Sequence, residues 1–326
     1  MTAHFSPACD LSSHSSFNSS SNPLSIYVGR FAPSPSGLLH FGSLVAALGS
    51  ALQARRHHGA WRLRIEDVDI ARIVPGAAAA ILATLENFGF EWDGEVMWQS
   101  QRIDAYMAAL ETLKAGNHVF PCACTRRELE EMPGATLARD GSLRYPGTCR
   151  AGLPPGRKAR AWRVRAEGQI DFVDAIQGQQ TEDLARDAGD YVILRADGLF
   201  AYQLAVVVDD AAQGVTHVVR GADLLGSTAR QIQLQRLLGL PEPAYAHLPV
   251  ATNAAAEKLS KQTRARAIDT LSPARALVAA LDFLGQTPLP ELSQASPADV
   301  WAWALAHWRL DRVPRRMHRV APVIET

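Results

Sequence analysis

The sequence predicts an α/β protein in which a parallel sheet is split by an inserted α+β subdomain and followed by a small helical region. Residues 26–30, 39–56 and 61–66 have the patterns of a strand, a helix and a second strand, which together form a βαβ unit. The pattern changes at about 117, where a cysteine cluster and a Pro/Gly-rich stretch begin, and it resumes at about 189. Ser-Pro pairs at 272–273 and 296–297 then predict two helix starts.

These patterns divide the chain into five parts. We expect a disordered Ser-rich tail at 1–24, the first half of the sheet at 25–116, the insertion at 117–188, the second half at 189–265 and the helical region at 266–326. The tail lacks the apolar core of a signal peptide, and no apolar stretch approaches the length of a membrane span. We therefore expect a cytoplasmic protein with no membrane partner.

Charge limits the kind of partner. Lys plus Arg and Asp plus Glu number 33 each, so the formal net charge is zero. This balance argues against general polyanion binding, and any contact with RNA must use a local basic patch.

Two segments contain groups that suit a nucleotide. Residues 33–43 are rich in Gly and Pro and lie between a strand and a helix, where backbone N–H groups and a helix N-terminus can approach phosphates. His40 is a candidate donor to a phosphate or ribose, and Gly42 would let an adenine approach the backbone. Lys258 and Lys261 place two ammonium groups on one loop, although such a pair can also be plain solvated surface.

Charged residues end several predicted strands, at the edge where open parallel sheets bind ligands. Arg30 ends the first strand and Glu66 ends the second. A guanidinium suits an acidic side chain, and a carboxylate suits an α-ammonium group. Arg220 ends a later strand and could supply a second positive contact, with Tyr202 in the same half of the fold. Each of these residues could instead belong to a structural ion pair.

Three of the four cysteines, Cys122, Cys124 and Cys149, cluster in the predicted insertion. So few cysteines are unlikely to form disulfides in a cytoplasmic chain, and three thiolates need only one more ligand to complete tetrahedral zinc. From chemistry alone His118 is the conventional fourth ligand. Buried free thiols are the alternative, because Cys-x-Cys is a tighter spacing than zinc sites usually have.

The two nucleotide segments resemble the paired signatures of class I aminoacyl-tRNA synthetases. The run from Arg30 to Ser43 resembles the HIGH signature, and Lys258-Leu-Ser-Lys-Gln262 resembles the KMSKS loop, in the expected order. The resemblance implies a Rossmann-like fold that activates a carboxylate with ATP, which Mg²⁺ would accompany. It implies catalytic roles for His40 and Lys261. The residues it implies for ATP binding are His40, Gly42, Ser43, Lys258 and Lys261.

A second set of residues matches the glutamate pocket of glutamyl-tRNA synthetases. The set comprises Arg30, Phe31, Ala32, Pro33, Ser34, Glu66, Tyr202 and Arg220. The resemblance covers about 25–265, and only residues 263–326 follow the second signature, so we expect stem-contact helices and no separate anticodon-reading domain.

This shortened form is similar to the glutamyl-queuosine tRNA(Asp) synthetases. The resemblance implies that the chain forms glutamyl-adenylate without tRNA and transfers L-glutamate to the queuosine base in the anticodon loop of tRNA(Asp), as a monomer. It also implies one structural Zn²⁺ held by Cys122, Cys124, Cys149 and the phenolate of Tyr145. Two alternatives remain: a shortened glutamyl-tRNA synthetase that charges a tRNA 3′ end, and a zinc-dependent RNA-binding paralogue without catalysis.

Overall fold

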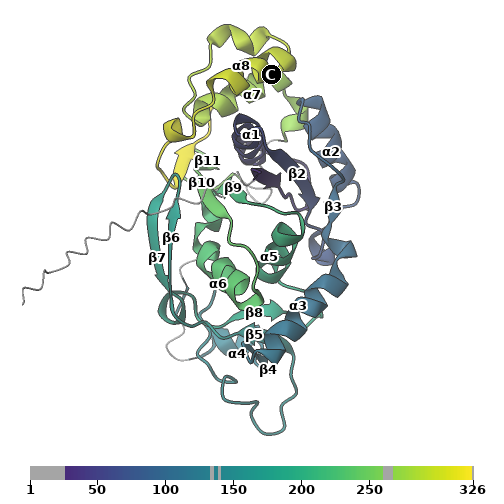
Figure 1. The fold of residues 1–326 in the computed structure, drawn as a ribbon, viewed down its shortest axis with the longest axis vertical. Helices are drawn as coiled ribbons and strands as arrows, with labels where there is room; N and C mark the ends of the chain where they lie inside the picture. Colours follow the sequence, from purple (N-terminus) through teal and green to yellow (C-terminus); the bar gives the residue numbers. More distant parts are fainter. Residues whose placement is uncertain (1–25, 133–135, 139–140, 260–266, 325–326) are drawn as a thin grey trace, which may run out of the picture.

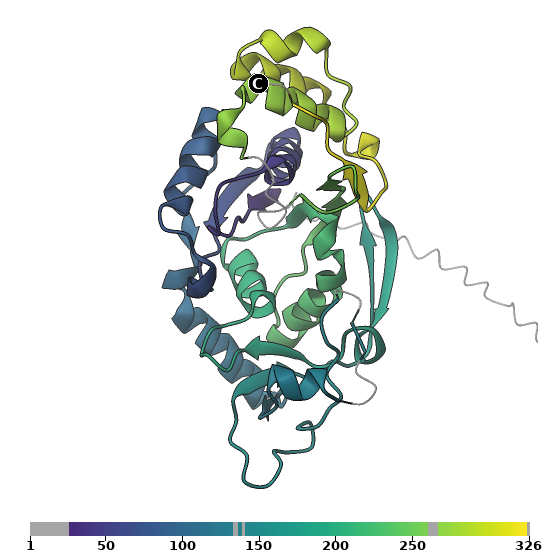
Figure 2. The same ribbon diagram turned by 180° about the vertical axis from the view of Figure 1, so that it is seen from behind.

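The computed structural model describes residues 26–132, 136–138, 141–259 and 267–324. The molecule is elongated, with the C-terminal helices at one end of its long axis and a small antiparallel sheet at the other (Figures 1 and 2). A central sheet lies between these two ends.

The central sheet has two parts. Three parallel strands form the first part in the order β1-β2-β3, and they are β1 (Val28–Phe31), β2 (Ala60–Ile65) and β3 (Met97–Trp98). Four strands form the second part in the order β7-β6-β10-β9, and they are β6 (Gln169–Asp174), β7 (Gly178–Asp183), β9 (His217–Gly221) and β10 (Ala244–Leu248). Strands β6, β10 and β9 run parallel, and β7 turns back as a hairpin on β6.

The two parts meet where β1 lies beside β9. The Thr216 N–H donates to the Val28 carbonyl at 3.0 Å, and the Val28 N–H donates to Thr216 Oγ1 at 2.9 Å. The carboxyl ends of β1, β2, β9 and β10 therefore lie along one edge of the central sheet. The predicted parallel α/β core is confirmed.

The central sheet separates two hydrophobic cores. Neighbouring residues of β9 enter different cores, Val218 one and Val219 the other, and Tyr245 and Ala246 do the same on β10. This alternation follows from the period of two in a strand. Helix α1 (Phe41–Arg56) packs on β1, β2 and β9 in the core that contains Val219. The other core holds α3 (Ile103–Ala115), α5 (Tyr202–Ala212) and α6 (Thr228–Leu238).

A small antiparallel sheet forms the lower end of the molecule in Figure 1. Its strands, in the order β4-β5-β8, are β4 (Val119–Cys122), β5 (Ala161–Val164) and β8 (Tyr191–Leu194). Helix α4 (Arg126–Glu130) follows β4 and begins with a capping box formed by Thr125 and Glu128. The small sheet includes β8, beyond the expected boundary at 188, whereas β6 within the expected insertion pairs with β10 of the central sheet.

The C-terminal region packs on α1. Helices α7 (Pro273–Phe283) and α8 (Pro297–His307) begin at the predicted prolines, and they share a core with α1. The segment after α8 returns toward the central sheet, because β12 (His318–Val320) pairs in parallel with β11 (Val250–Thr252), which follows β10. The sequence did not predict this pair.

The remaining elements are short connections and one further helix. They are α2 (Ala77–Asn87), a π-helical turn at Leu184–Ala188, and 3₁₀ turns at Ile70–Arg72, Gln99–Gln101, Ala222–Ser227, Ile268–Thr270, Pro290–Gln294 and Leu310–Arg312. None of the helices in the described ranges is long and apolar enough to cross a membrane.

Candidate active site

A cavity of about 610 Å³ opens where β1, β2 and β9 end. This volume is typical of small-molecule sites. The predicted residues that line it are Arg30, Phe31, Ala32, Pro33, Ser34, His40, Gly42, Ser43, Glu66, Tyr202, Arg220 and Lys258. The structure thus brings together both predicted sets, the glutamate set and the described members of the ATP set. Lys261 lies outside the described residues.

The N-terminus of α1 forms one wall of the cavity. His40 is the N-cap residue, and its Nδ1 accepts a hydrogen bond from the Ser43 N–H at 3.4 Å. With Nδ1 as an acceptor, the neutral ring carries its proton on Nε2 and can donate it. A Cβ atom on Gly42 would lie only 3.2 Å from the His40 ring, so a side chain there would displace this histidine. The helix N-terminus and the imidazole together suit a phosphate group.

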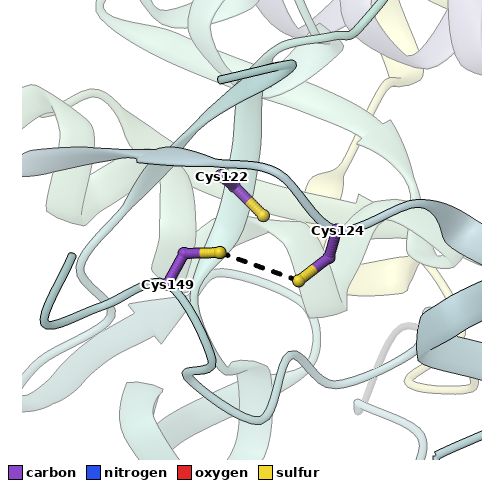
Figure 3. Close-up of side chains that lie close together, drawn as sticks. All are labelled: Cys122, Cys124 and Cys149. Carbon is purple, nitrogen blue, oxygen red and sulfur yellow. Dashed lines mark hydrogen bonds between the residues drawn. The ribbon is translucent and has the colours of Figure 1, made fainter. Parts of the chain in front are cut away.

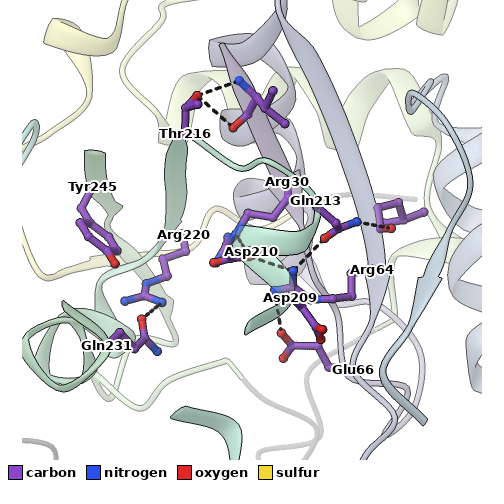
Figure 4. A network of polar contacts seen from close by, with 12 residues as sticks. Arg30, Arg64, Glu66, Asp209, Asp210, Gln213, Thr216, Arg220, Gln231 and Tyr245 are labelled. Carbon is purple, nitrogen blue, oxygen red and sulfur yellow. Dashed lines mark hydrogen bonds and ion pairs between the residues drawn. The ribbon is translucent and has the colours of Figure 1, made fainter. Parts of the chain in front are cut away.

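A network of buried charges lies beneath the cavity (Figure 4). Asp210 Oδ1 accepts hydrogen bonds from Arg64 Nη1 at 2.8 Å and from Arg30 Nε at 3.3 Å. Arg64 also donates to Glu66 Oε1 at 3.3 Å. Two arginines and two carboxylates thus balance in a region almost closed to water, and this balance fixes the positions of Arg30 and Glu66.

The two carboxylates respond differently to this setting. Burial opposes ionisation of Asp210, yet the charges of Arg30 and Arg64 hold the pKa of its carboxyl below the usual range. Burial raises the pKa of the Glu66 carboxyl, and the charges of Arg64 and Arg30 only partly oppose that effect. Glu66 would gain from a cation that entered the cavity beside it.

Arg220 is held on the opposite side of the cavity by neutral groups (Figure 4). Its Nε donates to His247 Nε2 at 3.0 Å, its Nη1 to Gln231 Oε1 at 2.8 Å and its Nη2 to Thr228 Oγ1 at 2.9 Å. Each terminal nitrogen also has one longer contact of 3.4 Å, from Nη1 to the Tyr202 hydroxyl and from Nη2 to the Leu224 carbonyl. Three short bonds fix the guanidinium, and the two weak contacts are those that an incoming anion could replace.

Lys258 and Leu259, which follow β11, line the cavity. Lys258 Nζ forms an ion pair with Asp223 Oδ2 at 2.5 Å, and both residues line the cavity. This contact holds the described beginning of the Lys258–Gln262 segment close to the turn that follows β9.

Sequence reasoning missed several residues of this site. Arg64 lies on β2, two positions before Glu66, which directly follows the strand, so the period of two indicates that both side chains point to the same face. Asp209 and Asp210 end an apolar run in α5, and adjacent acids in such a run indicate a buried charge partner. Asp223 and His247 had no comparable signal in the sequence.

The three predicted cysteines lie close together (Figure 3). Their sulfur atoms all lie within 4.8 Å of one another, and Cys124 Sγ is 3.7 Å from Cys149 Sγ. The Tyr145 hydroxyl lies 3.5 Å from both Cys122 Sγ and Cys124 Sγ. Across the described parts of the chain, no histidine belongs to this cluster, so Tyr145 and not His118 lies beside the sulfurs. The group of cysteines could hold a metal ion.

Hydrogen-bond donors surround the sulfur atoms. Arg163 Nε donates to Cys122 Sγ at 3.3 Å, and the Ala123 N–H donates to Cys149 Sγ at 3.5 Å. The Cys149 N–H donates to the Tyr145 oxygen at 2.8 Å, and the Arg163 guanidinium lies 4.0 Å from the centre of the Tyr145 ring. These donors and this positive charge favour anionic sulfur and oxygen ligands.

The chain is similar to known proteins over most of its length. Residues 27–288 match the family model described as tRNA synthetases class I (E and Q), catalytic domain. Glutamyl-Q tRNA(Asp) synthetase of Aromatoleum aromaticum is 69% identical over 91% of this chain and 93% of its own length. The protein of that name from Dechloromonas aromatica is 60% identical over 89% of this chain and 96% of its own length.

Solved structures give the same result for the fold. A glutamate-tRNA synthetase from Elizabethkingia anophelis is similar with a TM-score of 0.74 and 25% identity, over 89% of this chain and 67% of the other. From its matching residues, its fold and its relatives, the chain belongs to the glutamyl-Q tRNA(Asp) synthetases, within the class I tRNA synthetase family of the E and Q type.

Proposed function

We propose that this protein activates L-glutamate with ATP and transfers the glutamyl group to the queuosine base in the anticodon loop of tRNA(Asp). The observation that carries the proposal is a cavity that has the His40-capped N-terminus of α1 on one wall and the fixed guanidinium of Arg220 on another. The names of the similar proteins favour this acceptor over the 3′ end of a tRNA and over a paralogue without catalysis.

The cavity suggests how glutamate would be oriented. The side-chain carboxylate would replace the two weak contacts of Arg220 and would also face Arg30 across the cavity. The α-ammonium group would lie beside Glu66, whose buried carboxyl is stabilised as an anion by a nearby cation. The α-carboxylate would then point toward His40 and the start of α1, where ATP would bind.

Activation needs positioning more than proton transfer. A glutamate oxygen would attack the α-phosphorus of ATP, the bond to the β-phosphate oxygen would break, and pyrophosphate would leave. The nucleophile is already an anion, so no general base is required, and His40, Lys258 and Lys261 would offset the charge that develops on the phosphates together with Mg²⁺. In the second step a hydroxyl of the queuosine cyclopentenediol would take the glutamyl group as an ester and AMP would leave.

Glutamate-dependent exchange of pyrophosphate into ATP, measured without tRNA, tests this activation step. We expect exchange with glutamate and at least tenfold less with glutamine or aspartate at equal concentration, because Arg220 would lose its carboxylate partner or fail to reach it. Exchange that did not depend on glutamate would contradict the proposed function.

We also propose that the cysteine cluster holds one structural Zn²⁺ ion. In a tetrahedral site with Zn–S of about 2.3 Å, two sulfurs lie about 3.8 Å apart, and a sulfur and an oxygen about 3.5 Å apart. The measured separations are 3.7 Å for Cys124–Cys149 and 3.5 Å for Tyr145 to each of Cys122 and Cys124. The ion would join α4 and the loop that follows it to β4, in a part of the chain with only a small core of its own.

The five-part division of the chain also belongs to the proposal. The C-terminal helices α7 and α8 would contact an RNA stem, and the small sheet around β5 would lie near the acceptor. These two regions lie at opposite ends of the long axis (Figure 1), and an anticodon arm that contacted both would lie along the length of the molecule.

A further inference from the structure

The two arginines of the cavity are held in chemically different ways. Arg30 Nε donates to a carboxylate, Asp210, whereas Arg220 Nε donates to an imidazole, His247. Both arginines are buried to the same degree, with 4% of their surface exposed. Within the described ranges of the chain, no carboxylate forms a hydrogen bond or an ion pair with Arg220. The charge of Arg30 is therefore compensated inside the protein, and that of Arg220 is not.

A buried carboxylate determines which nitrogen of His247 carries the proton. His247 Nδ1 lies 2.6 Å from Asp174 Oδ2, and neither side chain is exposed. Because an ionised carboxylate only accepts, Nδ1 must donate to it, and Nε2 keeps its lone pair for the Arg220 N–H. Burial lowers the pKa of His247 to about 4, and the hydrogen bond to Asp174 only partly opposes that effect, so the ring is neutral at pH 7.

Asp174 is itself held rigidly. Its Oδ1 accepts backbone N–H groups of Ile176, Gln177 and His247 at 2.8–3.1 Å. Asp174 ends β6, His247 lies on β10 and Arg220 on β9, so the three side chains cross three adjacent strands of one sheet.

We propose that Asp174 and His247 are positioning residues that orient Arg220 through a neutral imidazole, so that its uncompensated charge binds the side-chain carboxylate of the amino acid substrate. This inference rests on the proposed function, because it assumes that glutamate enters the cavity. A carboxylate in place of His247 would hold the guanidinium equally well but would cancel the charge that recognises the substrate. Asp210 compensates the charge of Arg30 in this way. Arg220 is therefore left as the main anion-binding group of the pocket.

The test uses isosteric substitutions that change one proton position. In Asp174→Asn the amide can keep its oxygen toward the backbone donors and present its NH₂ group to His247. The ring would then accept at Nδ1 and carry its proton on Nε2, where it opposes the Arg220 N–H. Losing a hydrogen bond to a charged group should raise the KM for glutamate at least about tenfold in pyrophosphate exchange, with little change in the KM for ATP.

A second variant separates positioning from simple structural support. In His247→Gln the amide oxygen can lie where Nε2 lies and can accept the Arg220 N–H in its place. Because an amide has no tautomers, this acceptor does not depend on Asp174, and we expect the KM for glutamate to rise by no more than about threefold. The double variant Asp174→Asn/His247→Gln should then bind glutamate about as well as His247→Gln alone. Asp171→Asn, the same change at an exposed position of β6, is the matched control and should behave as wild type.

The outcomes distinguish the inference from the proposed function. If the wild-type protein shows no glutamate-dependent exchange, the proposed function fails and the inference fails with it. If the wild type is active but Asp174→Asn leaves the KM for glutamate unchanged, or raises it equally in the wild-type and His247→Gln backgrounds, the inference alone is overturned. An equal rise in the KM for ATP would also overturn it, because that pattern indicates general disruption of the site.

Discussion

Asp210→Asn should destabilise the fold by about 3 kcal/mol. Asp210 Oδ1 accepts from both Arg64 and Arg30, and its side chain is only 7% exposed. The asparagine oxygen can keep both hydrogen bonds, so the substitution removes mainly the negative charge. Each bond then changes from an ionic to a weaker ion–dipole contact, which costs about 1 kcal/mol. The rest comes from two buried arginines whose charge is then opposed only by Glu66 and by Asp209, which acts on Arg64.

Urea unfolding followed by circular dichroism measures this effect, with the slope of the transition as a check on two-state behaviour. Asp197→Asn is the matched control, because Asp197 pairs with Arg195 at the surface and its side chain is 49% exposed. We expect the control to lose less than about 1 kcal/mol. A loss below about 1 kcal/mol in Asp210→Asn as well would refute the description of this network as a balanced buried cluster.

Three further predictions concern the loop, the cysteine cluster and acid stability. Lys261→Ala should slow adenylate formation by about 10²–10³ with an unchanged unfolding transition, and an unchanged exchange rate would remove Lys261 from the mechanism. Cys149→Ala should reduce the zinc content of the purified protein, measured by atomic absorption, from about one equivalent to nearly none. The control variant Cys9→Ala should keep the metal, and equal zinc in both variants would contradict the proposed site. His247 has a folded pKa of about 4 against 6.5 in the unfolded chain, so its contribution to stability is complete above pH 6.5 and is lost as the pH falls toward 4. Between pH 7 and pH 4 the wild type should lose about 3 kcal/mol more than His247→Gln in urea unfolding, and identical losses would show that folding does not lower the pKa of His247.

The local signals in the sequence predicted the body of the fold. A strand, a Gly- and Pro-rich turn, a helix and a second strand in succession predicted β1, α1 and β2, and the two Ser-Pro pairs predicted the starts of α7 and α8. The pairing of β12 with β11 and the inclusion of β8 in the small sheet were not predicted. Both depend on contacts between segments distant in the chain, which periodicity and turn residues do not specify.

The same distinction applies to the site. Arg30, Glu66 and Arg220 were identified because each ends a strand, and strand ends of a parallel sheet meet at one edge. His247 and Asp174 were not identified, because a single histidine and a single aspartate gain their importance only when β10 brings β6 and β9 together. The sequence therefore predicted the residues that would face a ligand better than those that hold them in place.

The most direct test of the proposed function is transfer of labelled glutamate to bulk tRNA prepared with and without queuosine. The proposed function predicts label only in the pool that contains queuosine, held as an ester on the anticodon loop. Equal label in both pools, released by nuclease as an ester of the terminal adenosine, would contradict it and would mean that the protein charges an ordinary 3′ end.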